Sequence, residues 1–158
     1  LPTAVPASAA LAAAHQGMEV VIARPDGYEL DPEDTGLIRR IAQERGGEFV
    51  HIINDPDEAV VGADVVYVKS WGSLRHFGQT EAEAAFRSGL RDWRLTAARL
   101  RSTREGKGLV MHCLPVRRNV EIDDAVLDGP SSVVVDEAEN RLHVQRALLL
   151  ELLGSGSA

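Results

Sequence analysis

One short run of the chain holds most of the side chains that could do chemistry. Residues 111–118 read Met-His-Cys-Leu-Pro-Val-Arg-Arg, which puts an imidazole, a thiol, a proline and two guanidinium groups close together. A histidine at such a place can donate a hydrogen bond to a carbonyl oxygen that gains charge in a transition state. Arg117 can hold an oxyanion through its planar set of donors. The run therefore predicts a cationic pocket for a small anionic substrate.

Two further residues of this run have positioning roles in the hypothesis. Cys113 could contact an amine through its thiol or its backbone carbonyl. Pro115 lacks a backbone donor and predicts a tight turn with a cis peptide bond. The ordinary structural alternative is a strand-to-loop junction with a buried cysteine and solvated arginines. That alternative accounts for each residue singly more easily than for the whole run.

A second polar run, residues 136–143, reads Asp-Glu-Ala-Glu-Asn-Arg-Leu-His. It places Arg141 in the first turns of an expected helix, and the N-terminus of a helix itself attracts anions. The structural alternative for Arg141 is a salt bridge to Glu137 one turn earlier. Glu137 and Glu139 are expected to be structural, and His143 is expected to be a packing or surface residue.

Composition limits the classes of protein to which the chain can belong. The 158 residues, of which 44% are hydrophobic and 26% charged, predict one soluble domain with its own core. The net charge of −7 argues against a general nucleic-acid binder. No apolar run approaches the roughly 20 residues that cross a bilayer, and residues 1–8 lack the charged start of a signal peptide. The single cysteine rules out an internal disulfide, argues against a structural zinc site because thiolate partners are missing, and fits a cytoplasmic protein.

Strands and helices alternate along the chain, with Gly and Pro residues between them. Apolar runs predict five short strands, at residues 18–23, 49–53, 64–68, 108–111 and 132–135. Helical patterns lie around them, at residues 4–15, 32–45, 55–60, 91–100, 123–127 and 137–153. This order predicts an α/β domain built on a doubly wound parallel sheet of about five strands, with helices on both faces. The domain is expected to span residues 1–153, followed by a flexible tail at 154–158.

Polar residues follow three of the predicted strands. Lys69-Ser-Trp-Gly72 follows the third strand, His112 the fourth and Asp136 the fifth. In parallel sheets the binding crevice lies beyond the carboxyl ends of the strands. We therefore expect the three groups to form one site.

The two polar runs, with Asp128-Gly-Pro130 and Gly62-Ala-Asp-Val-Val-Tyr67, resemble the ornithine-type carbamoyltransferases. The resemblance covers nearly the whole chain but only the second, ornithine-binding half of such an enzyme. It implies a missing N-terminal domain, which carries the carbamoyl-phosphate-binding Ser-x-Arg-Thr loop, and a homotrimer at full length. It implies no cofactor and no metal. The net charge and the lack of a long apolar run predict no nucleic-acid and no membrane partner.

Lys69-Ser70-Trp71 points to a subfamily. Plain ornithine carbamoyltransferases have an aspartate before Ser-Met-Gly at this place, and it pairs with the free α-ammonium of ornithine. A lysine there would repel an α-ammonium but is acceptable beside an acylated nitrogen or a carboxylate. The segment thus resembles the N-acetylornithine or N-succinylornithine carbamoyltransferases. The structural alternative for Lys69 is a solvated lysine at a strand end.

The resemblance implies a transfer of the carbamoyl group from carbamoyl phosphate to the δ-amine of ornithine or, preferably, an N-acyl-ornithine, in arginine biosynthesis. It gives catalytic roles to three residues: His112 as an oxyanion donor, Cys113 beside the attacking amine and Arg141 at the carbamoyl or phosphate end. The residues expected to bind substrate are Lys69, Ser70, Trp71, Leu114, Pro115, Arg117 and Glu121.

Three positions depart from the subfamily pattern. Ala7 stands where an asparagine is usual, and Ala84 lies near the place of a lysine. Glu121 stands where the family can carry a lysine that becomes carboxylated, so a negative charge is kept. The departures leave open a carbamoyltransferase of specialised metabolism that acts on another amine. A non-catalytic amino-acid-binding module is the remaining alternative.

The resemblance also implies an unusual topology and an incomplete site. Residues 1–8 would pass through the loop at 72–89, which makes a shallow trefoil knot. Because the phosphate-binding half is absent, the fragment alone is expected to be inactive.

Overall fold

The computed structural model describes residues 2–46 and 50–154. The four strands are β1 (Val20–Ala23), β2 (Val50–Ile53), β3 (Val65–Val68) and β4 (Leu109–His112). The α-helices are α1 (Ala4–His15), α2 (Pro32–Glu44), α3 (Pro56–Ala59), α4 (Thr80–Ser88), α5 (Ala97–Arg101), α6 (Asp124–Leu127) and α7 (Val134–Gly154). Two 3₁₀ turns, η1 (Arg91–Trp93) and η2 (Arg104–Gly106), complete the elements.

Side-chain caps start several of these helices. Asp31 accepts a hydrogen bond from the backbone N–H of Glu33 just before α2, and Asp55 does the same for Asp57 at the start of α3. In both helices a proline occupies the first helical position, where its missing N–H costs no hydrogen bond. The predicted start of this helix at residue 32 is therefore confirmed.

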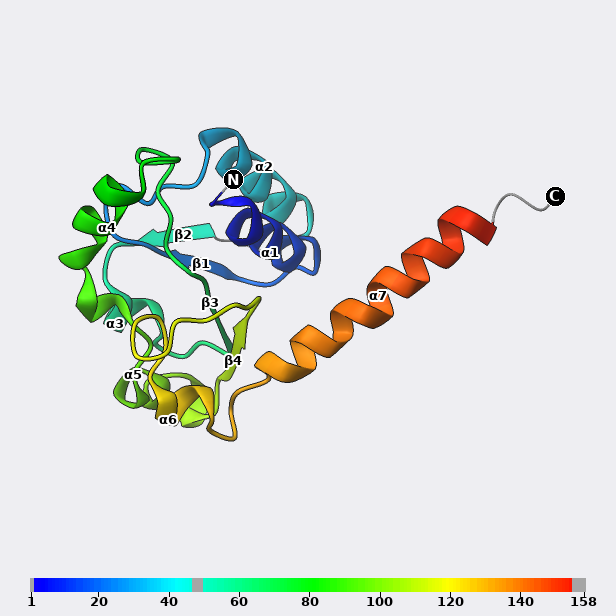
Figure 1. Ribbon diagram of the computed structural model, residues 1–158. Coiled ribbons are helices and arrows are strands. Elements are labelled where there is room, and N and C mark those ends of the chain that lie inside the picture. Colours follow the sequence, from blue (N-terminus) through cyan, green and yellow to red (C-terminus); the bar gives the residue numbers. More distant parts are fainter. Residues whose placement is uncertain (1, 47–49, 155–158) are drawn as a thin grey trace.

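The strands form two parallel pairs. β1 pairs with β2 from Val20↔Val50 onward, and β3 pairs with β4 from Val65↔Leu109 onward. Two clusters of buried apolar side chains accompany the pairs. One joins α1, β1 and α2 around Ile38, and the other joins β4 and α6 around Val110. The chain is thus an α/β fold whose parallel strands are covered by helices, as predicted (Figure 1).

The predicted fifth strand at 132–135 is wrong within the described chain. Only one bridge, Val110↔Ser132, continues the sheet beyond β4. Val133 still donates to the carbonyl of Val110 at 2.9 Å, but Glu137 donates its own N–H to Val133 at 2.9 Å and begins the helical pattern. α7 therefore starts at Val134 instead of 137, and the expected sheet of about five strands is seen as two pairs and a bridge.

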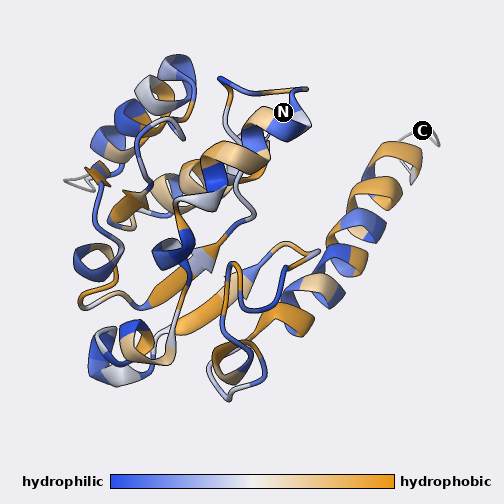
Figure 2. Cartoon of the chain, turned by 60° about the vertical axis from the view of Figure 1, so that its left-hand side comes forward, coloured by the Kyte–Doolittle hydropathy of each residue, from blue (hydrophilic) through white to orange (hydrophobic). Residues whose placement is uncertain are grey.

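α7 runs away from the rest of the molecule (Figure 1), and much of its outer half is coloured hydrophobic in Figure 2. Its large exposed apolar side chains include Leu142, Val144, Leu148, Leu149, Leu150 and Leu153. Gly154 belongs to this helix, so the predicted tail does not begin there, and residues 155–158 lie outside the described residues. None of the described helices combines the length and the hydropathy that a membrane span requires.

The start of the chain approaches the loop that follows β3. A Cβ built on Gly72 would lie 2.6 Å from the Cβ of Pro2, closer than side-chain carbons approach one another. Gly72 is therefore required where these two segments meet, since any larger residue would push Pro2 away.

Candidate functional site

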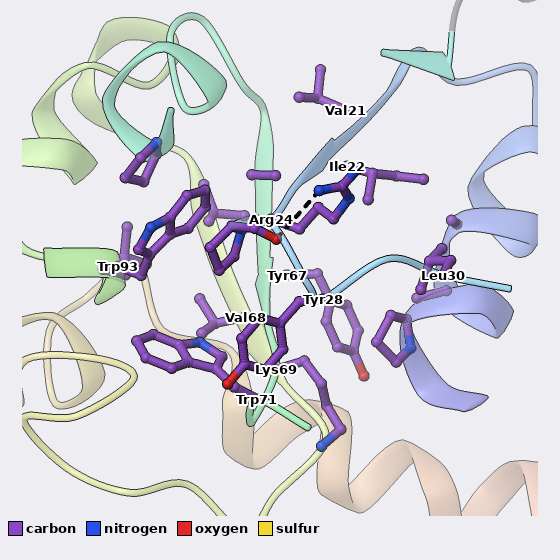
Figure 3. A pocket seen from close by; sticks show the side chains of 18 of the residues that line it. Val21, Ile22, Arg24, Tyr28, Leu30, Tyr67, Val68, Lys69, Trp71 and Trp93 are labelled. Carbon is purple, nitrogen blue, oxygen red and sulfur yellow. Dashed lines mark hydrogen bonds between the residues drawn. The ribbon is translucent and has the colours of Figure 1, made fainter. Parts of the chain in front are cut away.

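A cavity of about 370 Å³ lies between β1 and β3. The predicted substrate-binding residues Lys69, Ser70 and Trp71 all line it, since they follow β3 directly. Lys69, Trp71 and Tyr28 gather at one end of the cavity, and the apolar side chains of β1 line it farther in (Figure 3). The cavity therefore combines an apolar wall with a cationic and aromatic mouth, which suits an anionic molecule with an aliphatic part.

An aromatic group holds the mouth in shape. The ring of Tyr28 meets that of Trp71 edge-on, with 6.4 Å between centroids, and stacks on Phe86 at 5.5 Å. The Tyr28 hydroxyl donates to Glu83 at 2.9 Å, and Ser73 donates to the same carboxylate at 2.6 Å. Burial and the hydrogen bond to Glu83 both raise the pKa of Tyr28. These contacts tie α4 to the loop after β1 and fix the position of Trp71.

Sequence reasoning missed Tyr28, Glu83 and Phe86. Tyr28 follows the turn after β1, so an aromatic residue near the carboxyl end of a strand was a usable signal. Glu83 and Phe86 lie three positions apart on α4, which puts them on one helix face. Neither the pairing of that face with Tyr28 nor the contact with Ser73 can be seen in the sequence.

Lys69 differs from the other cations of the cavity wall, Arg24, Arg94 and Arg99, each of which forms an ion pair with a carboxylate. The Lys69 Nζ lies 3.5 Å from the carbonyl oxygen of the neighbouring Ser70, and no carboxylate of the described residues forms an ion pair with it. A lysine that lines a cavity without an acidic partner is an electrostatic attraction for an anionic ligand.

The predicted strand-end loops do meet. The Ser70 hydroxyl donates to the carbonyl of Pro115 at 3.4 Å, which joins the loop after β3 to the loop after β4. The Leu114–Pro115 peptide bond is cis, as predicted. Leu114 is partly exposed and has a positive φ of 54°, and the half-buried Cys113 thiol lies near the hydroxyl of Tyr67.

His112 is enclosed by protein on every side. Its side chain is fully buried, its Nδ1 accepts a hydrogen bond from the Leu114 N–H at 2.9 Å, and its Nε2 lies 3.1 Å from Glu121 Oε2. Since the Leu114 N–H occupies Nδ1, the ring proton must lie on Nε2 and point at Glu121. In this structure neither ring nitrogen faces the cavity, so direct donation by His112 to an oxyanion, as expected from the sequence, does not fit the geometry.

Glu121 is placed differently from the expectation as well. Its side chain is fully buried, and it accepts hydrogen bonds from Arg117 Nε at 2.6 Å and from the Arg117 backbone N–H at 3.1 Å. Burial alone would raise the pKa of the Glu121 carboxyl, but the hydrogen bonds from His112 and Arg117 outweigh it and lower the pKa to about 2. The carboxylate therefore contacts protein donors behind the site instead of lining the cavity.

The two arginines of the run have different environments. Arg117 lies over Glu121 with 40% of its side chain exposed, so it can still meet a ligand at the surface of the site. Arg118 forms ion pairs with Asp124 and Asp128, both at 2.7 Å, and belongs to the surface around α6. The pair shows why neighbouring arginines in a sequence need not share a role.

The structure does not bring Arg141 to the cavity. Arg141 is exposed on α7 and is not among the residues that line the cavity. Glu137, its suggested partner, instead accepts hydrogen bonds from the Tyr67 hydroxyl at 2.6 Å and from the His112 backbone N–H at 2.9 Å. Glu137 thus anchors the first turn of α7 to the ends of β3 and β4.

The described residues contain no group of three or more His, Cys, Asp and Glu side chains arranged to hold a metal ion. The cavity is lined by Lys69, by the aromatic mouth and by three arginines that are paired with carboxylates, Arg24, Arg94 and Arg99. Cys113, Leu114, Pro115 and Arg117 are not among its lining residues, and their loop joins it through the hydrogen bond from Ser70 to Pro115.

Comparisons with known proteins match this arrangement to one family. Residues 3–152 match the family model described as aspartate/ornithine carbamoyltransferase, Asp/Orn binding domain. The chain is 41% identical over 155 residues to the N-acetylornithine carbamoyltransferase of Xanthomonas campestris, which covers 98% of this chain and 45% of that protein. It is also 41% identical over 147 residues to the ornithine carbamoyltransferase of Archaeoglobus fulgidus, covering 93% of this chain and 45% of that protein.

Solved structures give the same result. A crystal structure of acetylornithine transcarbamylase complexed with acetylcitrulline superposes with a TM-score of 0.88 at 41% identity, over 96% of this chain and 45% of that one. The chain spans less than half the length of these relatives. It belongs to the aspartate/ornithine carbamoyltransferase family and corresponds to the Asp/Orn binding domain of its members.

Proposed function

We propose that the chain is the acceptor-binding half of an enzyme that carbamoylates the δ-amine of an N-acylated ornithine, in cytoplasmic arginine biosynthesis. Family membership supports the reaction class. The observation that carries the choice of acceptor is Lys69, which lines the cavity and forms no ion pair with a carboxylate of the described residues. A free α-ammonium would be repelled there, whereas a carboxylate or an acylated nitrogen would not.

The proposed reaction needs two substrates held together. The neutral δ-amine attacks the carbonyl carbon of carbamoyl phosphate, a C–N bond forms, the C–O bond to phosphate breaks and the amine loses a proton. The backbone of Cys113 and Leu114 would orient the amine, and Arg117 would steady an anionic group at the surface of the site. Most of the acceleration would come from fixing the two reactants in the right geometry and from donors in the other half of the protein.

The rest of the protein would supply the carbamoyl-phosphate domain. The exposed leucines of α7 support this proposal, because residues 147–153 form an almost wholly apolar stretch of helix, and such a stretch is normally buried. Arg141, on the same helix, would then reach the carbamoyl or phosphate end only after α7 packs against that domain. We propose a homotrimer for the full-length protein, as the family resemblance implies. The close approach of Pro2 to Gly72 supports a shallow threading of the N-terminal segment.

Replacing Lys69 with methionine tests the choice of acceptor. This change keeps the aliphatic stem and removes the charge, so affinity for N-acetylornithine or N-succinylornithine is expected to fall about 10-fold. Calorimetric titration in the presence of carbamoyl phosphate measures the effect. The matched control is Lys107→Met, because Lys107 is exposed and pairs with Glu105 far from the cavity. Tighter binding of plain ornithine than of either acylated form would contradict the proposal.

The 158-residue chain by itself is expected to form no citrulline derivative from carbamoyl phosphate and any ornithine. Half of the proposed phosphate-binding donors would be absent, and α7 would lack the domain that brings Arg141 into the site. A colorimetric assay for ureido groups measures the product. Turnover by the purified chain would show that the active site is complete without the second domain.

A further inference from the structure

The backbone around Glu121 is held in place by hydrogen bonds to a buried segment of the core. The Glu121 backbone carbonyl accepts from the Leu95 N–H at 2.8 Å, and the next residue, Ile122, is completely buried and bridges to Leu95. Asp123 returns a hydrogen bond to the Leu95 carbonyl at 3.0 Å. The carboxylate therefore cannot move far without disturbing a packed segment.

Three donors converge on this one carboxylate. They are the His112 Nε2–H at 3.1 Å, the Arg117 N–H at 3.1 Å and the Arg117 Nε–H at 2.6 Å. A carboxylate can accept all three because it carries acceptor sites on both oxygens. A neutral amide of the same shape has only one acceptor oxygen, so it would oppose a donor to at least one of these N–H groups.

The chain of contacts ends at the Leu114 backbone. With its proton held on Nε2 by Glu121, the His112 ring presents an unprotonated Nδ1 to the Leu114 N–H at 2.9 Å. Leu114 has a φ of 54°, a left-handed conformation that a leucine adopts only when its surroundings impose it. The hydrogen bond to His112 is one of the contacts that impose it.

We propose that Glu121 is a positioning residue, which acts through His112 to fix the Leu114 turn and through Arg117 to aim its guanidinium group. The proposal rests on the proposed function, in which the Cys113–Leu114 backbone orients the attacking amine. It gives His112 a structural task in the site in place of contact with the reacting oxygen. The Glu121 carboxylate also neutralises the charge of Arg117. The arginines that line the cavity are paired with carboxylates as well, so among the described lining residues the unpaired positive charge comes from Lys69.

The His112 tautomer tests the proposal without any assay of activity. Nitrogen-15 NMR of the unmodified chain is expected to show a neutral ring with the proton on Nε2, and slow hydrogen exchange at the Leu114 amide. A ring with its proton on Nδ1, a doubly protonated ring, or an unprotected Leu114 amide would overturn the proposal. Because these signals come from the chain without a ligand, they remain informative even if no ornithine derivative binds.

The variant Glu121→Gln carries the second arm of the test. In either orientation the amide turns its NH2 group toward a donor, either Arg117 Nε–H or His112 Nε2–H, so we expect the network to loosen and Leu114 amide exchange to accelerate about 10-fold or more. The matched control is Asp124→Asn, which makes the same charge change on a half-exposed residue that pairs with Arg118. The conservative variant Glu121→Asp keeps the charge and is expected to retain the Nε2–H tautomer. An unchanged exchange rate of the Leu114 amide in folded Glu121→Gln would overturn the proposal.

Binding of the acceptor substrate by the same two variants is the last measurement. If the proposed function holds, Glu121→Gln weakens N-acetylornithine binding while Asp124→Asn does not. If wild-type chain binds no ornithine derivative, the proposed function fails, and the NMR arms alone decide the positioning role.

Discussion

Replacing His112 with alanine is expected to lower the free energy of unfolding of the chain by about 3 kcal/mol. The change removes a donor from the buried Glu121 carboxylate and the acceptor of the Leu114 N–H, and it leaves a void in a fully buried position. An unsatisfied buried polar group costs about 1–3 kcal/mol, and a cavity adds to that cost.

Urea unfolding followed by circular dichroism measures this loss. The matched control is His143→Ala, because His143 is exposed on α7 and its contact with Glu139 is long, at 3.8 Å. That substitution is expected to stay within about 0.5 kcal/mol of the unmodified chain. A loss below about 1 kcal/mol for His112→Ala would mean that water or a neighbouring group replaces the ring.

Lowering the pH is expected to reduce the free energy of unfolding by a similar amount, because the Glu121 carboxylate becomes protonated. The pKa of Glu121 lies at about 2 in the folded chain, below the ordinary value of 4.5. A lowered folded-state pKa adds stability that is fully present above the unfolded value and is lost as the pH falls toward the folded value. The stability that Glu121 adds is therefore expected to be constant above about pH 5 and to fall by about 3 kcal/mol between pH 4.5 and pH 2.

The comparison of unmodified chain with Glu121→Gln across this range isolates the effect, since the glutamine does not titrate. Asp124→Asn is again the control. Asp124 also has a lowered pKa, caused by hydrogen bonds from Arg118 and Asn119, but it is exposed at the surface. Its contribution should therefore weaken in added salt, whereas that of the buried Glu121 should persist. A difference between unmodified and Glu121→Gln chains that does not change with pH would contradict the assignment.

Local signals in the sequence predicted much of the fold. Apolar runs located β1 to β4 to within two residues at the ends that the structure describes, and Asp31-Pro32 marked the start of α2. These features depend on residues close together in the chain, so a reader of the sequence has the information needed. The cis bond before Pro115 belongs to the same class.

The fifth strand failed because a distant contact outweighed local propensity. Ser132-Val-Val-Val135 is rich in β-branched residues and therefore favours a strand. In the structure, Glu137 must reach the Tyr67 hydroxyl and the His112 N–H, and it does so from the first turn of a helix. No pattern within residues 132–137 reveals those partners.

The sequence placed three predicted binding residues beside a cavity, but it did not reveal the contacts among the site residues. Lys69, Ser70 and Trp71 do line a cavity, and the loop of Pro115 does join them. The enclosure of His112 depends on Glu121 and Leu114 together, and the mouth depends on Tyr28 meeting a helix far along the chain. Residue types indicate which groups can react, whereas only the tertiary structure shows which nitrogen is already occupied.

The two separate apolar clusters have a consequence for cooperativity. One cluster stabilises the β1–β2 half, and the other stabilises the β3–β4 half. No strand ladder of the described residues joins β1 to β3, and the cavity lies between them. Each half can therefore open with its own free energy, as independent folding units do. A molecule that fills the cavity touches both halves at once, so its binding energy is expected to merge two local openings into one concerted transition. Ligand binding would then slow local opening throughout the domain, and not only at the residues that contact the ligand.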